Sequence, residues 1–464
     1  MVKLWGVVVF LILFSCQSFE PVPQNEVKKS LQKMNLSLAY EPQLDPRVAC
    51  DSVSRNMLQM LFEGLTRIGP DGSPHLAVAE KVSVEEDGLR YIFTLRACEW
   101  SNKEAVTAYD FEYTWKSRLT KALNSPLQSA MNLIKNREKI RKGELTQDHL
   151  GVKALSTKVL EVELETPIEN FLEVISDPVF FPISAKADKE NPSWAEVEAK
   201  EFVGNGPFSL EEWKHFMQLK VVKSDSYWDR EAVTLEKLNF VIMENDEEIR
   251  QFSAGTLDWL GFPFSYLDQK AMNIIGKKQE KEVIPLNYTV HFNQEKSPFN
   301  QEKVRRSFSL SIQRQLFPEN INVWSQSDPL LHEDVDLLVA ETLFTELSEK
   351  THLELTFKPI ECIYPKGERN YALANYLVKQ WESLFSVKVH LIELSRHDFR
   401  KTFEGGAFQL ACFPTYLEEE SHNEDESLSF SVYFFSQPYL KQSWVDNVQL
   451  SSRGFIDFKW GSIN

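Results

Sequence analysis

Two hydrophobic patterns alternate along this chain, and the alternation limits the folds open to it. Residues 89–96 (LRYIFTLR) alternate polar and apolar side chains with period two, which is typical of a half-buried strand. Phe111, Trp115 and Leu119 follow at helical spacing, with Thr107 as the expected N-cap. Because strands and helices of ordinary length are mixed throughout, we expect an α/β fold rather than a helical bundle or a β-sandwich.

Further elements follow from the same signals. A helix is expected through residues 53–62, and strands are expected over 36–40, 65–68 and 159–164. Gly204 and Gly206 flank an asparagine, which predicts a turn that needs positive φ.

The size of the chain predicts several domains. Its 464 residues correspond to roughly three domains of about 150 residues each. Hydrophobic residues make up 42% of the chain, so it can bury large cores. The formal net charge of −17 would repel a phosphate backbone, and we therefore expect no nucleic-acid partner.

The N-terminus has the pattern of an export signal. An apolar run over residues 4–14 is too short to span a bilayer and has the length of a signal-peptide core. It leads into Leu-Phe-Ser-Cys, which resembles a bacterial lipobox with Cys16 as the acylated residue. Residues 1–16 are then the signal peptide and 17–35 a polar tether. The alternative is ordinary signal-peptidase cleavage that removes Cys16.

The other cysteines are Cys50, Cys98, Cys362 and Cys412. None forms a Cys-x-x-Cys or Cys/His pair with zinc-ligand spacing, so we expect no metal site. One or two disulfides can form in an exported protein, but the sequence does not pair them. The alternative is that these are isolated thiols in the core.

Two acidic runs resemble cation sites at first sight. Residues 244–248 are better explained as a helix start, since carboxylates favour the positive end of a helix and Gly255 follows as a stop signal. Residues 418–426 are denser and include a histidine, but a solvated loop explains them more simply than a cation site.

The sequence contains no motif of enzyme chemistry. It has no P-loop, no His-Glu-x-x-His, no Gly-x-Ser-x-Gly and no dinucleotide-binding glycine motif. We therefore expect a protein that binds a solute, without a cofactor, rather than an enzyme.

Four stretches resemble one family. The first holds Leu-Asp-Pro, Leu-Phe-Glu-Gly-Leu and Val-Thr-Ala-Tyr-Asp-Phe within residues 44–115, and the second holds Gly-Asn-Gly-Pro-Phe and Tyr-Trp-Asp within 203–229. Phe-Asn-Gln and Pro-Phe-Asn follow within 292–308, and a closing segment spans 445–458. In this order they resemble the oligopeptide-binding proteins of peptide ABC transporters, the family 5 solute-binding lipoproteins, over residues 36–464.

The resemblance implies a periplasmic-binding-protein fold with two lobes joined by a hinge and an extra inserted domain. The expected parts are lobe I (36–62, 159–285 and 431–464), the inserted domain II (63–158) and a shortened lobe III (286–430).

The resemblance also implies the function. The protein would capture oligopeptides or peptide-like cell-wall fragments between its lobes and deliver them to an ABC permease with its ATPase subunits. It would work as a monomer in the periplasm, anchored to the membrane by its lipid.

The resemblance supplies candidate ligand contacts. Ser52 and Val53 match a segment whose backbone lines the binding cleft in relatives. The other candidates are Leu127, His291, Phe413, Tyr416 and Glu418.

Several of these positions depart from the family pattern. Phe413 takes the place of a tryptophan, and Tyr416 falls where relatives place a carboxylate that pairs with the ligand's α-amino group. Glu418 is the expected amine partner instead. Leu127 stands where tyrosine is frequent, and His291 where an acidic residue is common. The alternative function is therefore the same fold with a non-peptide ligand or a protein-docking role.

Overall fold

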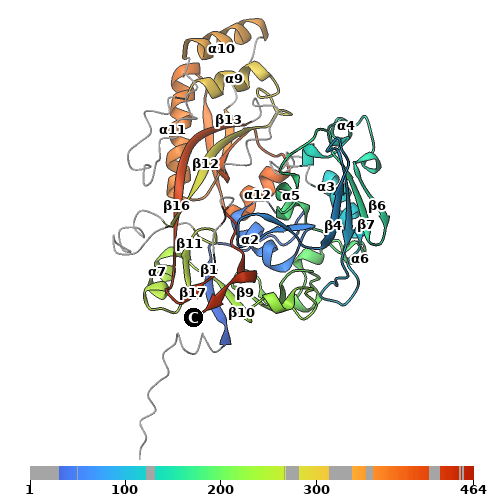
Figure 1. The fold of residues 1–464 in the computed structure, drawn as a ribbon. Coiled ribbons are helices and arrows are strands. Elements are labelled where there is room, and N and C mark those ends of the chain that lie inside the picture. Colours follow the sequence, from blue (N-terminus) through green and yellow to red (C-terminus); the bar gives the residue numbers. More distant parts are fainter. Residues whose placement is uncertain are drawn as a thin grey trace, which may run out of the picture.

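The computed structural model describes residues 31–49, 51–121, 131–265, 267, 282–312, 337–351, 359–416, 429–448, 451 and 454–464. Within these residues the strands form three larger sheets and two two-stranded ones. We call the larger ones the first, second and third sheets, in the order in which they begin along the chain (Figure 1). Helices and strands are mixed in sequence, which confirms the expected α/β class.

The first sheet joins strands that are far apart in sequence. Its order is β1-β10-β9-β8, in which β1 runs parallel to β10 and the other neighbours are antiparallel. The apolar side chains of Met34, Leu36 and Leu38 are buried, as the alternation in β1 requires. The bounds are β1 (Lys33–Leu38), β8 (Phe208–Lys214), β9 (Gln218–Lys223) and β10 (Lys237–Ile242).

The second sheet is antiparallel, with the order β4-β5-β7-β6. Its bounds are β4 (Ala79–Val84), β5 (Arg90–Leu95), β6 (Val152–Ser156) and β7 (Val159–Glu163). The predicted alternation in β5 is confirmed, since Tyr91, Phe93 and Leu95 are buried. The sheet extends to Glu163 because β7 pairs with β5 and β6, so it runs past the predicted domain boundary at 158.

The helix α3 (Ala108–Lys121) packs against β6 and β7 of the second sheet. Its start differs in detail from the prediction. The carboxylate of Asp110 accepts hydrogen bonds from both the backbone N–H and the hydroxyl of Thr107, at 2.8 and 2.9 Å. Thr107 therefore acts as a donor before the helix, and the acid in the first turn ties the two positions together.

The third sheet has the order β11-β16-β12-β15-β13-β14. Strands β14 and β15 run parallel to β13, and the remaining pairs are antiparallel. The strand bounds are β11 (Trp259–Gly261), β12 (Glu282–Phe292), β13 (Ile360–Pro365), β14 (Val389–Leu394), β15 (Leu410–Tyr416) and β16 (Ser429–Lys441).

Helices cover both faces of this third sheet. Successive residues of β13 enter different clusters: Cys362 shares one with Leu377 and Trp381 of α11, and Ile363 shares another with Phe399 of α12. The helices around this sheet are α9 (Glu302–Leu310), α10 (Leu337–Thr351), α11 (Glu368–Phe385) and α12 (Arg396–Glu404).

The remaining elements are short. They are α2 (Ser52–Leu61), β2 (Thr66–Ile68), β3 (Pro74–Leu76), α4 (Arg137–Arg141), α5 (Phe171–Val174), α6 (Ala185–Glu190), α7 (Asn245–Ser253), β17 (Val445–Asp446) and β18 (Ser462–Ile463). Single 3-10 turns lie at Gln147–His149, Pro178–Phe180, Trp194–Glu196, Ala199–Glu201, Arg230–Ala232 and Phe458–Trp460. The acidic run at 244–248 does start a helix, α7, and Gly255 follows it with φ +71°.

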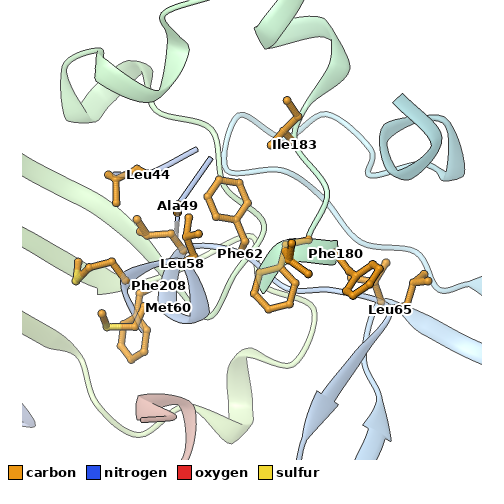
Figure 2. Packing of buried hydrophobic residues seen from close by; sticks show 14 of the residues in the cluster. Leu44, Ala49, Leu58, Met60, Phe62, Leu65, Phe180, Ile183 and Phe208 are labelled. Atoms are coloured by element: carbon orange, nitrogen blue, oxygen red, sulfur yellow. The ribbon is translucent and has the colours of Figure 1, made fainter. Parts of the chain in front are cut away.

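One hydrophobic cluster joins the first and second sheets. Figure 2 shows part of it: Leu58 and Met60 of α2 lie near Phe208 of β8, and Phe180 and Leu65 lie further along the same cluster. The third sheet has separate clusters on its two faces. The first two sheets therefore share one core, while the third has its own.

The first and third sheets meet at β11. The backbone N–H of Asn35 in β1 donates to Asp258 Oδ2 at 2.7 Å, and the indole of Trp444 donates to Asp258 Oδ1 at 2.8 Å. On its other side β11 pairs with the end of β16, and Trp259 stacks on Tyr439 at 4.5 Å. Two segments of the chain thus pass side by side between these sheets.

Candidate functional site

Several of the motifs that resemble the family meet at one buried carboxylate. Glu63 lies between α2 and β2 and has no exposed surface. Its Oε1 accepts the Tyr227 hydroxyl at 2.6 Å and Nη1 of Arg67 at 3.2 Å. Its Oε2 accepts the indole N–H of Trp228. Burial raises the pKa of Tyr227, so its hydroxyl remains a donor to this charge.

Arg67 extends this cluster to the end of the chain. Its guanidinium donates to both carboxylate oxygens of Asp457, at 2.6 and 2.9 Å. Burial alone would lower the pKa of Arg67, but Asp457 and Glu63 outweigh that effect and the pKa is raised. The Leu-Phe-Glu-Gly-Leu, Tyr-Trp and closing motifs are therefore parts of one structural cluster. The amino-acid sequence reveals these motifs but not their common contact.

The Gly-Asn-Gly motif belongs to the same region, and its predicted positive φ is wrong. Positive φ occurs at neither Gly204 nor Gly206. Both glycines are required by close approach instead: a Cβ on Gly204 would lie 2.3 Å from the Leu61 oxygen, and one on Gly206 would lie 2.5 Å from the Leu61 carbon. Between them the Asn205 amide group bonds the backbone N–H and C=O of Glu63, each at 3.0 Å.

Ser52 and Val53 form the first turn of α2 and are both buried. Asp51 caps this helix, since its carboxylate accepts from the Ser54 N–H at 2.9 Å and the Tyr40 hydroxyl at 2.9 Å. One turn later, Asn56 accepts from the backbone N–H of residue 456 at 2.7 Å. The predicted ligand contacts at Ser52 and Val53 therefore lie in the first turn of α2, which is held in place by its N-cap and by the C-terminal segment.

His291 and Phe413 lie together in the third sheet. Their rings stack at 4.7 Å, and Phe403 of α12 meets the imidazole edge-on at 5.6 Å. His291 Nε2 is buried and has no hydrogen-bond partner among the described residues. Burial lowers the pKa of His291 to about 3, so the imidazole is neutral at physiological pH. His291 is thus half-buried, with its ring packed beneath α12.

The other candidates are placed less fully. Tyr416 ends β15, where its backbone pairs with Leu286 of β12. Leu127, Glu418 and Cys16 lie outside the described residues. The structure thus brings His291 and Phe413 into contact. It places Val53 in the core shared by the first two sheets, with Ser52 buried next to it.

The described part of the chain has neither a metal-binding cluster nor a membrane-spanning helix. There, no group of three or more His, Cys, Asp or Glu side chains is arranged to hold a metal ion. No helix in that part of the chain is long and apolar enough to cross a membrane.

Comparisons with known sequences give a consistent family. Residues 73–418 match the model of the bacterial extracellular solute-binding proteins, family 5. The chain is 35% identical over 546 aligned positions to the Bacillus subtilis dipeptide-binding protein DppE, covering all of this chain and 99% of that one. It is 34% identical to the oligopeptide-binding protein OppA of the same organism, over 70% of this chain and only 62% of the relative.

Another relative differs in the ligand it is named for. The Escherichia coli protein YgiS, a probable deoxycholate-binding periplasmic protein, is 29% identical over 73% of this chain and 60% of its own length.

Solved structures show the fold. Haemophilus influenzae OppA in complex with RPPGFSPFR matches 93% of this chain and 99% of its own, with a TM-score of 0.75 at 18% identity. The substrate-binding domain of an oligopeptide ABC transporter from Bacillus anthracis matches the same shares, with a TM-score of 0.73 at 21% identity. These matches confirm the predicted periplasmic-binding-protein fold. With the family model covering most of its length, the chain belongs to family 5 of the bacterial extracellular solute-binding proteins.

Proposed function

We propose that this protein captures oligopeptides, or peptide-like cell-wall fragments, outside the cytoplasm and delivers them to an ABC permease with its ATPase subunits. The observation that carries the proposal is the match to a dipeptide-binding protein over the whole of this chain and 99% of the relative. The family consists of solute-binding proteins, so the proposal contains no catalytic step.

The arrangement of the sheets supports capture between two bodies. The first and second sheets share a core, the third sheet has its own, and β11 and β16 run between them. We propose that these bodies are lobe I with the inserted domain II, and lobe III, and that they close over a ligand by bending at the crossing strands.

The proposed ligand contacts come from both bodies. From the first we assign the backbone at Ser52 and Val53, and from lobe III the side chains of Phe413 and Tyr416. Glu418 is the proposed partner of the peptide α-amino group, because a carboxylate binds an ammonium by a charge-assisted hydrogen bond. Leu127 and His291 remain predictions of the resemblance, and the packing of His291 beneath α12 gives it a structural role as well.

For the N-terminus we propose lipid attachment at Cys16 and cleavage of the bond that precedes it, with the residues from 17 to the start of β1 at Lys33 as a tether. The protein would then act as a monomer at the outer face of the membrane.

A thermal-shift experiment tests the function. Protein lacking residues 1–16 is melted alone and with a library of tri- to pentapeptides. A binder present at 100 times its Kd adds about 2.7 kcal/mol to the free energy of unfolding, which appears as a higher melting temperature. An unchanged melting temperature with every peptide would contradict the proposal.

A second function, with a non-peptide ligand, is favoured by two observations. The alignment with DppE spans 546 positions against 464 residues in this chain, a difference of 82 positions that this chain lacks. The relative YgiS is named for a bile acid. Native mass spectrometry of freshly purified protein distinguishes the two functions, because a co-purified peptide and a co-purified steroid differ in mass and in fragmentation.

A further inference from the structure

Two cysteine thiols of the third sheet lie in contact. Cys362 is in β13 and Cys412 in the neighbouring parallel strand β15, and their Sγ atoms are 3.5 Å apart. In the register of these strands Cys362 lies opposite Leu410, so Cys412 is two residues further along and faces the same side. Both side chains are fully buried against α11.

We propose that Cys362 and Cys412 form a disulfide bond in the exported protein. The sulfur atoms of a disulfide are about 2.0 Å apart, so the pair requires a further approach of about 1.5 Å. Because the two cysteines lie diagonally across β13 and β15, rotation about χ1 must be accompanied by a small shift of the strands. The family is extracellular, and disulfides form and persist in oxidising compartments.

Bond formation requires an oxidant, and we assign this role to the disulfide of an extracytoplasmic thiol–disulfide oxidoreductase. One cysteine thiolate attacks that disulfide to give a mixed disulfide and one enzyme thiolate. The second cysteine thiolate then displaces the other enzyme sulfur. The two cysteines lose two protons and two electrons in total, and the oxidoreductase disulfide becomes two thiols.

The timing follows from burial. In the folded protein neither thiol is exposed, and burial raises the pKa of Cys412 well above that of a free thiol. Exchange therefore takes place during folding, before α11 covers this face of β13 and β15. The bond then closes a loop across 50 sequence positions that contains α11, β14 and α12.

Peptide mapping tests the pairing. Full-length protein is expressed with its own export signal, and cells are treated with iodoacetamide before lysis so that free thiols are blocked. We expect the Cys362 and Cys412 peptides to be joined, at a mass two hydrogens below the sum of the two. Carbamidomethyl groups on both cysteines, or either cysteine paired elsewhere, would overturn the proposal. Cys98→Ser is the control and should leave the linked peptide unchanged, because Cys98 packs in the core of the first two sheets.

Treatment with a reductant distinguishes a disulfide bond from two thiols that only pack against each other. A phosphine reductant should lower the melting temperature of the wild-type protein by roughly 5 °C, since it reopens a long loop. It should not change the melting temperature of Cys362→Ala, Cys412→Ala or the double variant. Equal melting temperatures of wild-type protein with and without reductant would show that the two thiols only pack together.

Discussion

The hydroxyl of Tyr227 donates a 2.6 Å hydrogen bond to the buried carboxylate of Glu63, 164 positions earlier in the chain. This contact explains why two separate motifs are needed for one scaffold. The Glu63 charge is stabilised by Tyr227, Trp228 and Arg67, which between them supply an O–H and two N–H donors. Removing any partner leaves a buried group unsatisfied, which costs more than the bond itself contributes.

Glu63→Gln is expected to destabilise the protein by about 3 kcal/mol. The glutamine amide keeps one acceptor oxygen, but its NH2 group would face one of the donors that now bind the carboxylate. The guanidinium of Arg67 would also lose one of its negatively charged partners. Thermal or urea unfolding measures the change.

The matched control is Glu231→Gln at an exposed position. It should change the free energy of unfolding by less than about 0.5 kcal/mol. If the two variants unfold alike, Glu63 is not the centre of the cluster.

Gly206→Ala should destabilise the protein by about 2 kcal/mol or more. The alanine Cβ would lie 2.5 Å from backbone atoms of Met60, Leu61 and Phe62. Backbone atoms at the end of a helix cannot move out of the way by a change of side-chain rotamer. Gly72→Asn is the control, since Gly72 has open space around it and asparagine tolerates its φ of +77°. A melting temperature for Gly206→Ala close to that of the control would contradict the close approach.

The half-buried His291 should make stability depend on pH. An unfolded chain takes up a proton near the ordinary pKa of about 6.5, whereas the folded protein does so only near pH 3. The free energy of unfolding therefore falls as the pH drops from about 6.5 towards 3, by up to about 1.4 kcal/mol per pH unit.

Urea unfolding of His291→Phe at pH 7 and pH 5 checks this effect. The variant should lose less stability over that interval than the wild-type protein. His149→Gln, at an exposed position, should behave as the wild-type protein does. Parallel pH profiles for all three proteins would show that His291 takes up its proton at the same pH in the folded and the unfolded state.

Glu418→Gln should weaken the binding of peptides with a free α-amino group by roughly tenfold, because a charge-assisted hydrogen bond is lost. Binding of the N-acetylated peptides should be unchanged. Calorimetry with both peptide forms measures the difference, and Glu420→Gln in the same acidic run is the control. An equal loss for both peptide forms would remove the amine-binding role.

Local sequence patterns predict several helices and strands, but they do not predict how these elements contact one another. Alternation predicted β5, and helical spacing predicted α3. The sequence alone does not tell why glycine is required at position 206, because positive φ and close approach of the backbone both select glycine. Only the fold shows that the end of α2 lies opposite Gly206. Likewise, period two shows which face of β12 His291 occupies but does not reveal that α12 covers that face.

The paired crossing of β11 and β16 restricts how the two bodies can move. Trp259, Leu260 and Gly261 pair with Lys441, Leu440 and Tyr439 respectively, so neither segment can bend alone without breaking ladder hydrogen bonds. A change in the angle between the first and third sheets must instead twist both strands as one ribbon. The relative motion then has few independent directions, and the same pair of segments that joins the bodies also guides them along a single path.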